Sequence, residues 1–232
     1  MSCSDPDDFE DSTDRVLWCA APPPFSSFSD LFWCSAFIPK IDQFELTSND
    51  PSLGQVTVEV PDTLRHAVAK RRREFLVGRT CAAFALRQAG APEFIFSGPS
   101  GPQWPKGFHG SISHTDKFAM AVVSSTNVRV GCDCETVLSP QRYVETKDLI
   151  ASPAELSLKP KSWFNEEFAT LVFSAKEAFY KAVHTSWQPR LSFETVSLQE
   201  VSDNSLVLSA MGKSFNVFFT GKDDMFLTLC MI

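Results

Sequence analysis

The chain has 232 residues, of which 44% are hydrophobic and 21% are charged, as is ordinary for a globular protein of one domain or two small ones. Its formal net charge of −7 argues against a general nucleic-acid-binding protein. No run of about 18 apolar residues is present, so we expect no membrane span, and the acidic N-terminus does not resemble a secretory signal. The seven cysteines lack C-x-x-C pairs, which favours reduced thiols and a cytoplasmic protein.

The first sixty residues carry the weakest signals. Residues 1–15 are polar and acidic, which predicts a flexible lead-in. Two apolar stretches, Val16–Cys19 and Phe32–Ile38, predict strands, and the turn formers between residues 42 and 60 predict a loop.

The strongest helix prediction covers Pro61–Gln88. Proline suits a first helical turn, and Gly90 suits the position just past the end. Arg71 and Arg79 would lie within about a quarter turn of each other. A basic run on a helix is usually a solvated face. Guanidinium groups also bind phosphate in a bidentate way, so a phosphate clamp is the second interpretation.

A loop and two strands follow the helix. Ala91–Gly107 is rich in Pro and Gly and is predicted to be loop. The next segment, G-S-I-S-H, is built of small residues that let a ligand approach the backbone, and Ser113 and His114 can donate to phosphate oxygens. A lone histidine is more often structural. The apolar segments Phe118–Val123 and Val128–Glu135, separated by a short turn, predict a hairpin-like pair.

Two acidic residues alternate with cysteines at the end of the second of these strands. Because side chains on a strand alternate between faces, Asp133 and Glu135 should share one face and Cys132 and Cys134 the other. Neighbouring carboxylates repel unless a cation or a proton lies between them, and oxygen ligands suit Mg²⁺. The alternative is a solvent-facing acidic strand end. The cysteines are predicted to be core, because no nearby Cys or His completes a soft-metal site.

The segment Thr136–Lys161 is polar and predicts a lid or a partner-facing loop with a short helix near Arg142–Ala151. A long helical pattern then runs from Trp163 to Val183. The last part of the chain alternates and predicts four strands of a sheet: Leu191–Leu198, Ser205–Ala210, Ser214–Thr220 and Met225–Met231.

The long helix carries Glu177, a candidate third carboxylate ligand, with Lys176 and Lys181 as neutralising cations. Two plainer interpretations stay open. Glu177 and Lys181 are four residues apart and could form a surface ion pair. Ser174 and Glu177 could instead form a capping box.

Four motifs occur in order along the chain: R-R-x-E-F-x-x-x-R, W-P-x-G-x-x-G-S-x-S-H, V-G-x-D-x-E and F-S-A-K-E-x-x-Y-K. This arrangement, over about Ala69–His184, resembles the 4'-phosphopantetheinyl transferases, in particular the Sfp-like group of the enterobactin synthase component D type. The resemblance implies an α+β fold of two similar α/β halves related by a pseudo-twofold axis, with the active site between them. After the lead-in, we therefore place an N-terminal half at residues 16–125 and a C-terminal half at residues 126–232.

The resemblance also implies a reaction and a set of site residues. The phosphopantetheine arm of coenzyme A would pass to a serine of an apo acyl or peptidyl carrier protein, releasing adenosine 3',5'-bisphosphate. Asp133, Glu135 and Glu177 would hold Mg²⁺ against the diphosphate. Glu177 would also be the base for the carrier serine, directly or through a water. The implied contacts to coenzyme A are Lys176 and Lys181 to the diphosphate, Ser113 and His114 to the phosphates, and Arg71 and Arg79 to the 3'-phosphate end.

One departure and several alternatives accompany this hypothesis. Relatives often carry a basic residue before W-P, whereas Glu93–Gln103 has none and Phe96 and Ser97 lie at that place. A metal-dependent nuclease and a non-catalytic module that binds coenzyme A or a carrier protein are the alternative functions; the negative net charge argues against the nuclease. We expect a monomer. The carrier could serve nonribosomal peptide, siderophore, polyketide or fatty-acid synthesis, and we expect it to dock near Thr136–Lys161.

Overall fold

The computed structural model describes residues 16–22, 24–40, 47–48, 51–92, 96–98, 101–222 and 224–232. The predicted lead-in over residues 1–15 lies outside them, as do residues 93–95 of the predicted loop before Trp104. The helices are α1 (Ala69–Gln88), α2 (Pro140–Ile150), α3 (Pro153–Leu156) and α4 (Asn165–Ala182). The strands are β1 (Val16–Trp18), β2 (Leu31–Phe37), β3 (Thr47–Ser48), β4 (Phe96–Gly98), β5 (Gly101–Gln103), β6 (His109–His114), β7 (Phe118–Ser124), β8 (Val130–Thr136), β9 (Ser197–Val201), β10 (Ser205–Ala210), β11 (Lys213–Lys222) and β12 (Met225–Met231).

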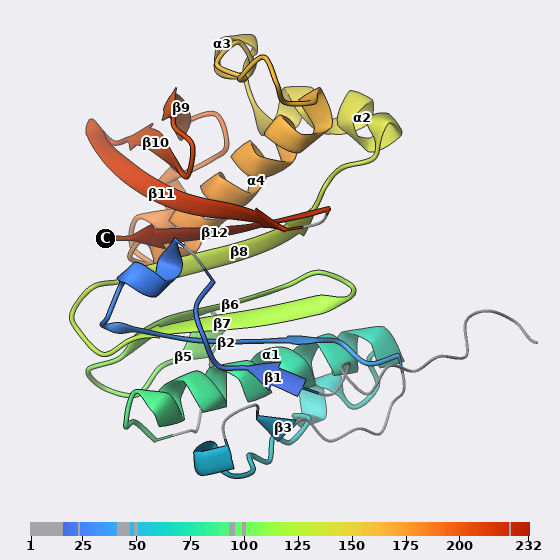
Figure 1. The fold of residues 1–232 in the computed structure, drawn as a ribbon, viewed down its shortest axis with the longest axis vertical. Helices are drawn as coiled ribbons and strands as arrows, with labels where there is room; N and C mark the ends of the chain where they lie inside the picture. Colours follow the sequence, from blue (N-terminus) through green and yellow to red (C-terminus); the bar gives the residue numbers. More distant parts are fainter. Residues whose placement is uncertain are drawn as a thin grey trace, which may run out of the picture.

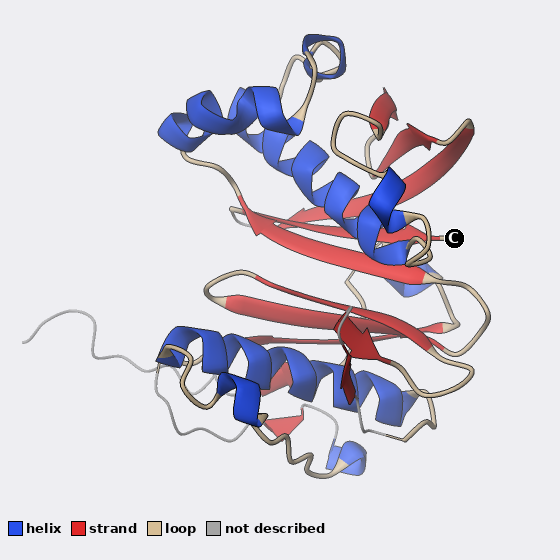
Figure 2. Cartoon of the chain, turned by 180° about the vertical axis from the view of Figure 1, so that it is seen from behind, coloured by secondary structure: helices blue, strands red, loops and turns tan. Residues whose placement is uncertain are grey.

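Two five-stranded sheets, each packed against one long helix, make up most of the molecule (Figure 1). The first has the order β3-β1-β2-β7-β6 and packs against α1; the second has the order β8-β12-β11-β10-β9 and packs against α4. Seen from behind, the two helices lie on the outer sides and the sheets between them (Figure 2). The predicted α+β class is confirmed, and the pseudo-twofold axis stays a prediction. Among the described residues, no helix is both long and apolar enough to cross a membrane.

The inner faces of the two sheets share one apolar core. Trp33 and Met120 of the first sheet belong to the same buried cluster as Cys132, Cys134 and Leu229 of the second. Burial raises the pKa of the Cys132 thiol to about 11, which keeps it protonated and inert. The interpretation of both cysteines as core residues is therefore confirmed.

The hairpin predicted from β7 and β8 is wrong. β7 pairs with β2 on one side and with β6 on the other, so it has no edge left for another strand. β8 pairs with β12, almost a hundred residues further along the chain. The turn between β7 and β8 thus carries the chain from one sheet to the other. As a result, β6 lies against β8 where the two sheets meet.

Helix α1 begins later than predicted and ends where predicted. Pro61 precedes a separate short 3-10 helix at Asp62–Leu64, so its helix-start signal belongs to that element. The end is a Schellman motif, in which Gly90 adopts φ +72° and donates to the Arg87 carbonyl. Ala91 donates to the carbonyl of Leu86 in the same motif.

The strand predicted at Leu191–Leu198 is shorter in the structure. Ser192 and Thr195 bond to each other through both hydroxyls and backbone amides, and this closes a turn in the middle of the predicted segment. β9 therefore begins only at Ser197. The other three C-terminal strands and the helices α2 and α4 lie close to their predicted positions.

Candidate active site

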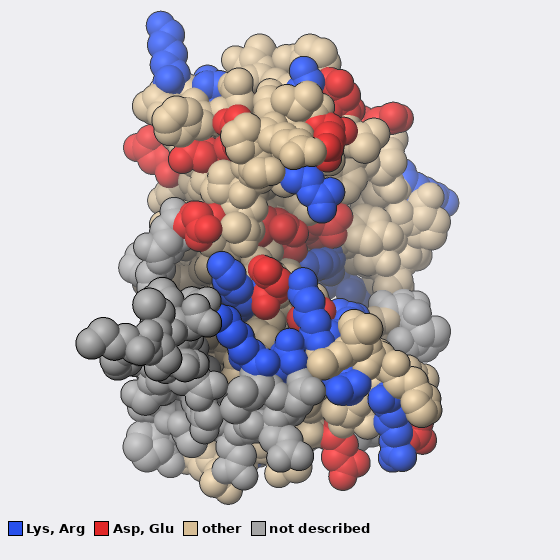
Figure 3. Space-filling view, turned by 90° about the vertical axis from the view of Figure 1, so that its right-hand side faces the viewer, with Lys and Arg blue, Asp and Glu red and all other residues tan. Residues whose placement is uncertain are grey.

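Most of the predicted site residues gather where β6, β8, α1 and α4 meet. On one face of the molecule, Lys and Arg side chains surround acidic ones across the middle, between the two halves (Figure 3). The acidic side chains predicted as ligands come from β8 and α4, which belong to the second half, and His114 and Arg71 come from the first. The site thus joins residues that are more than a hundred positions apart in the sequence.

Gly131 explains the start of the V-G-x-D-x-E motif. A Cβ atom added there would lie 2.0 Å from the carbonyl oxygen of Ala178 and 2.5 Å from the amide nitrogen of Ala182. Only glycine lets the backbone of α4 approach β8 this closely. That approach brings Glu177 and Lys181 of α4 next to the carboxylates of β8.

Changing Gly131 to Ala is expected to destabilise the protein, because the new methyl group must push α4 away from β8. We expect the free energy of unfolding to fall by about 3 kcal/mol, the upper end for an overpacked core. Denaturant titration measures this. The matched control is Gly221→Ala in β11, where the added Cβ would meet only the Phe226 ring, at 3.3 Å. Equal unfolding free energies for the two variants would contradict the packing argument.

Asp133, Lys181 and Ser113 form the centre of the site. The Asp133 side chain is almost fully buried, and its Oδ1 accepts hydrogen bonds from Lys181 Nζ at 2.7 Å and from the Ser113 hydroxyl at 2.8 Å. Lys181 also donates to the Ser113 hydroxyl and to the Cys132 carbonyl. Burial lowers the pKa of Lys181, but the Asp133 carboxylate outweighs it and holds that pKa above its ordinary value. Lys181 is therefore a cation, and it binds Asp133 rather than Glu177.

Glu135 and Glu177 lie in the electrostatic field of Asp133. Burial, with Asp133 and Glu177 nearby, raises the pKa of Glu135 to about 7. Burial and Asp133 likewise raise the pKa of Glu177, against the opposing effect of Lys181. Three carboxyl groups thus lie near one another, and the single positive charge of Lys181 does not balance three negative charges.

The donor set fits a divalent cation, although its ligands are not gathered into a finished site. Asp133 Oδ2 is buried and has no hydrogen-bond partner in the structure, which is costly for a carboxylate unless a cation binds there. All three carboxylates are hard oxygen donors, which suits Mg²⁺. In the described part of the chain, no three His, Cys, Asp or Glu side chains are placed closely enough to hold a metal ion. The Glu135 and Glu177 side chains would have to move to complete it.

The raised pKa of Glu135 predicts a pH-dependent stability without divalent metal. The native state binds this proton more tightly than the unfolded state, so the contribution of Glu135 to stability is greatest below about pH 4.5 and is lost as the pH rises to about 7. We expect the gain in unfolding free energy from Glu135→Gln to grow over this range. Denaturant titrations of both proteins in chelator at pH 5, 6, 7 and 8 measure it. A constant difference would contradict the raised pKa.

His114 lies at the end of β6 and contacts the start of α1. Arg71 donates to His114 Nε2 at 3.1 Å, and His114 Nδ1 lies 3.3 Å from the Thr115 carbonyl. Burial, aided by Arg71 and Lys181, lowers the pKa of His114 despite the nearby Glu74. The neutral tautomer that accepts from Arg71 and donates to Thr115 fits both contacts.

Glu74 is a site residue to which the sequence analysis gave no role. Its carboxylate is almost buried and lies 3.5 Å from Arg71, 3.9 Å from Lys70 and 4.0 Å from His114. The i, i+3 and i, i+4 spacing from two basic residues was the available signal. Glu74 aims the Arg71 guanidinium toward His114 and the centre of the site.

Arg79 lies on the same helix as Arg71, about 12 Å further along its axis. Its guanidinium packs over the Phe75 ring, and burial lowers its pKa. Only long, extended side chains would let Arg71 and Arg79 reach one ligand group. The clamp formed by both arginines stays a prediction.

The structure does not bring Lys176 to the carboxylates. Its ammonium group points to the other side of α4, where it binds Glu155 at 2.8 Å and the carbonyls of Ile150 and Phe193. The predicted contact of Lys176 with a diphosphate is therefore not supported by its position. The alternative in which Ser174 and Glu177 form a capping box is ruled out, because Ser174 lies inside α4 and bonds to Thr228 of β12.

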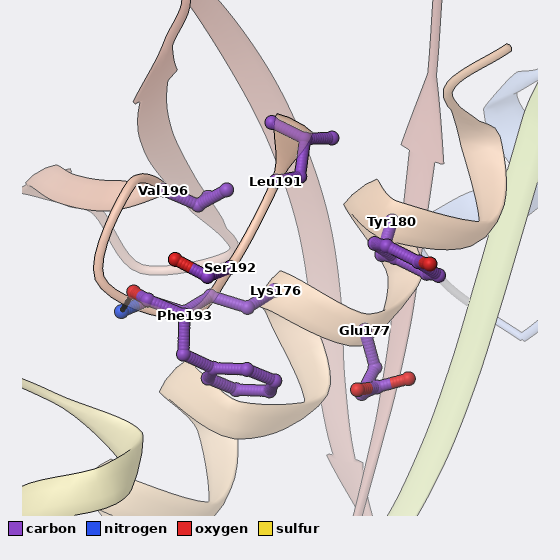
Figure 4. A pocket seen from close by; sticks show the side chains of 7 residues that line it. All are labelled: Lys176, Glu177, Tyr180, Leu191, Ser192, Phe193 and Val196. Carbon is purple, nitrogen blue, oxygen red and sulfur yellow. Dashed lines mark hydrogen bonds between the residues drawn. The ribbon is translucent and has the colours of Figure 1, made fainter. Parts of the chain in front are cut away.

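An apolar cavity of about 210 Å³ lies beside Glu177. Figure 4 shows Glu177 and Tyr180 of α4 facing the loop that carries Leu191, Phe193 and Val196. A carboxylate at the rim of a small apolar cavity can take up a proton while an uncharged chain fills the space beside it.

The family is decided by comparison with known proteins. The model of the 4'-phosphopantetheinyl transferase N-terminal domain matches residues 60–124, and that of the 4'-phosphopantetheinyl transferase superfamily matches residues 129–230. Enterobactin synthase component D of Escherichia coli (strain K12) is 34% identical over 169 residues, which are 72% of this chain and 80% of the relative. The chain belongs to the 4'-phosphopantetheinyl transferase family.

Two further relatives support the same assignment. Enterobactin synthase component D of Salmonella typhimurium is 40% identical to this transferase over 123 residues, 52% of each chain. The 4'-phosphopantetheinyl transferase PptT of Mycobacterium tuberculosis is 35% identical over 167 residues, 69% of this chain and 72% of the relative. The two family segments of this transferase meet between residues 124 and 129, in the connection that leads from β7 to β8. This membership favours the transferase over the nuclease alternative.

Proposed function

We propose that this transferase moves the 4'-phosphopantetheine arm of coenzyme A to a serine hydroxyl of an apo carrier protein in the presence of Mg²⁺. The serine oxygen forms a bond to the phosphorus of the arm, and the bond from that phosphorus to the bridging diphosphate oxygen breaks. The serine proton passes to a carboxylate, and adenosine 3',5'-bisphosphate leaves. The observation that carries the proposal is the buried Asp133, whose Oδ1 binds Lys181 while its Oδ2 has no partner.

Asp133, Glu135 and Glu177 would hold Mg²⁺, which supplies positive charge against the diphosphate and so stabilises the leaving group. Lys181 supplies a second positive charge, since its ammonium group lies at the carboxylate of Asp133 and would reach a diphosphate bound there. Ser113 holds both Asp133 and Lys181 in place through its hydroxyl.

Glu177 is the proposed base for the carrier serine, directly or through a water. Its pKa is raised from the ordinary value toward neutral pH, where a general base works best. It also lines the apolar cavity, so a chain bound there would lie beside the carboxylate. We propose that this cavity takes the uncharged pantetheine arm of coenzyme A.

Arg71 and Arg79 are the proposed contacts to the phosphates of coenzyme A, and Ser113 and His114 would join them by exchanging a present partner, Asp133 for the Ser113 hydroxyl and Thr115 for His114 Nδ1. Because His114 is neutral, its contact with Arg71 adds no negative charge, while the Glu74 carboxylate 3.5 Å away orients the guanidinium and offsets part of its charge. We leave Lys176 out of the transfer machinery because its ammonium group points away from the carboxylates of β8 and its side chain is only 2% exposed, whereas 29% of the Lys181 side chain is exposed.

The deciding experiment is mass spectrometry of apo carrier proteins after incubation with coenzyme A, Mg²⁺ and the protein. A mass gain of one phosphopantetheine on the carrier, lost in chelator, is the expected result. Unchanged carrier mass with retained binding of coenzyme A would point to a binding module. Degradation of added DNA without carrier modification would point to a nuclease. Either outcome would overturn the proposal.

The carrier itself is best found with a small panel of apo carriers. Two relatives are named as components of enterobactin synthase, so carriers of siderophore and other nonribosomal peptide synthetases come first. Helix α2 presents Leu149, which is 75% exposed and lines a pocket together with Arg142 on the same face of the helix, and this face is the proposed docking surface for an acidic carrier. A monomer in the cytoplasm stays our prediction.

A further inference from the structure

Lys176 is the one Lys or Arg in the described part of the chain that is buried. Its side chain is 2% exposed, and its ammonium group donates to Ile150 O at 3.0 Å, to Phe193 O at 2.9 Å and to Glu155 Oε1 at 2.8 Å. An ammonium group has three protons, and each has one acceptor here. Lys181 also has three acceptors, but 29% of its side chain is exposed, whereas burial closes the ammonium group of Lys176 to a substrate phosphate.

Glu155 connects this lysine to two other parts of the second half. Its Oε1 also accepts from the amide of Leu198 in β9, and its Oε2 accepts from the amide and the hydroxyl of Ser152 at the start of α3. The S-x-x-E spacing of Ser152 and Glu155 is a capping box, a signal that was visible in the sequence.

The position of Phe193 depends on this pair. The Phe193 carbonyl binds Lys176, and its ring stacks on Phe173 at 5.4 Å. The same residue forms a wall of the cavity beside Glu177 (Figure 4). Lys176 therefore fixes the loop that closes the cavity. It directly precedes Glu177, the carboxylate that borders the same cavity.

We propose that Lys176 and Glu155 act as a positioning pair that shapes the cavity for the pantetheine arm, and that Lys176 does not touch the diphosphate. The inference rests on the proposed function, since it takes the cavity to be the pantetheine site. It assigns different work to the two lysines of one motif: Lys181 to the reacting phosphates and Lys176 to the wall of the cavity.

The test uses two ligands that share the diphosphate. Coenzyme A carries the pantetheine arm, and adenosine 3'-phosphate 5'-diphosphate lacks it. We expect Lys176→Met and Glu155→Gln each to weaken binding of coenzyme A several-fold, up to about tenfold for the lysine variant, because the arm loses its apolar contacts. Binding of the shorter ligand should stay within about twofold of the original. Calorimetry at fixed Mg²⁺ measures both.

The double variant Glu155→Gln, Lys176→Met shows whether the two residues act as one unit. Its loss of coenzyme A binding should be close to that of Lys176→Met alone, because the second change removes a partner that is already unpaired. The double variant also keeps the test valid if Lys176→Met fails to fold, because it buries no unpaired charge. Lys161→Met, an exposed lysine, is the matched control and should bind both ligands normally.

An equal loss of both ligands in Lys176→Met would overturn the inference, since it would show a contact to the diphosphate. So would losses that add up in the double variant. Kinetics give a second measurement. If Lys176 has a positioning role, Lys176→Met raises KM for coenzyme A more than it lowers kcat. If the original protein binds coenzyme A but modifies no carrier, the proposed function fails while the binding comparison still decides the inference. If it binds both ligands equally well, the inference fails.

Discussion

Glu177→Gln is expected to lower the rate of carrier modification by about 10³-fold at saturating Mg²⁺ while the protein stays folded. The amide cannot accept the serine proton and is a poorer ligand for a hard cation. Stability should be unchanged or slightly higher, because burial and Asp133 already disfavour the ionised form of Glu177 in the native state. Single-turnover mass spectrometry and thermal unfolding measure the two effects.

The control for this variant is Glu200→Gln, which neutralises an exposed carboxylate on β9, away from the site. It should leave both the rate and the unfolding temperature as they are. Near-normal turnover of Glu177→Gln would remove Glu177 from the roles of base and ligand. A variant that is inactive because it is unfolded would be recognised from its thermal transition.

Asp133→Asn is expected to abolish transfer and, unlike Glu177→Gln, to destabilise the protein. Lys181 would lose its ion-pair partner while 29% of its side chain is exposed, so water replaces only part of the lost interaction. We expect the unfolding free energy to fall by about 3 kcal/mol, the low end for a broken buried ion pair. Urea titration and the carrier assay measure the two losses.

The double variant Asp133→Asn, Lys181→Met separates stability from chemistry. It removes both charges, so most of the stability should return. Activity should not return, because the proposed metal ligand and the proposed cation for the diphosphate are both removed. A double variant that is stable and active would show that this pair has no part in the reaction.

The local parts of the site were predictable and the long-range parts were not. The alternation of side chains on a strand placed Asp133 and Glu135 on one face, and the structure has the two cysteines on the other. The pairing of β8 with β12 has no local signal, because the turn after β7 looks the same whether the chain reverses or crosses to another sheet. The meeting of Ser113 with Asp133 depends on that crossing.

The two lysines of the F-S-A-K-E-x-x-Y-K motif show what helix geometry adds. Residues 177 and 181 are about 40° apart around the axis, whereas residues 176 and 181 are about 140° apart. Lys176 and Lys181 therefore could not both face one diphosphate on a straight helix. This constraint was available in the sequence. What the sequence could not give was the partner of Lys176, because Glu155 lies twenty-one positions away on a different element.

The outermost strands of the two sheets, β6 and β8, are joined by hydroxyl groups where a continuous sheet would have a backbone ladder: Ser111 donates to the Cys132 carbonyl, and Ser113 bonds to Asp133. This contact can shift without breaking a strand pair in either half, but full separation of the sheets would expose the apolar core that they share. A donor substrate that binds the proposed arginines of the first half and the carboxylates of the second would hold the two strands together. We therefore expect the protein without substrate to be the more flexible of the two forms at this contact.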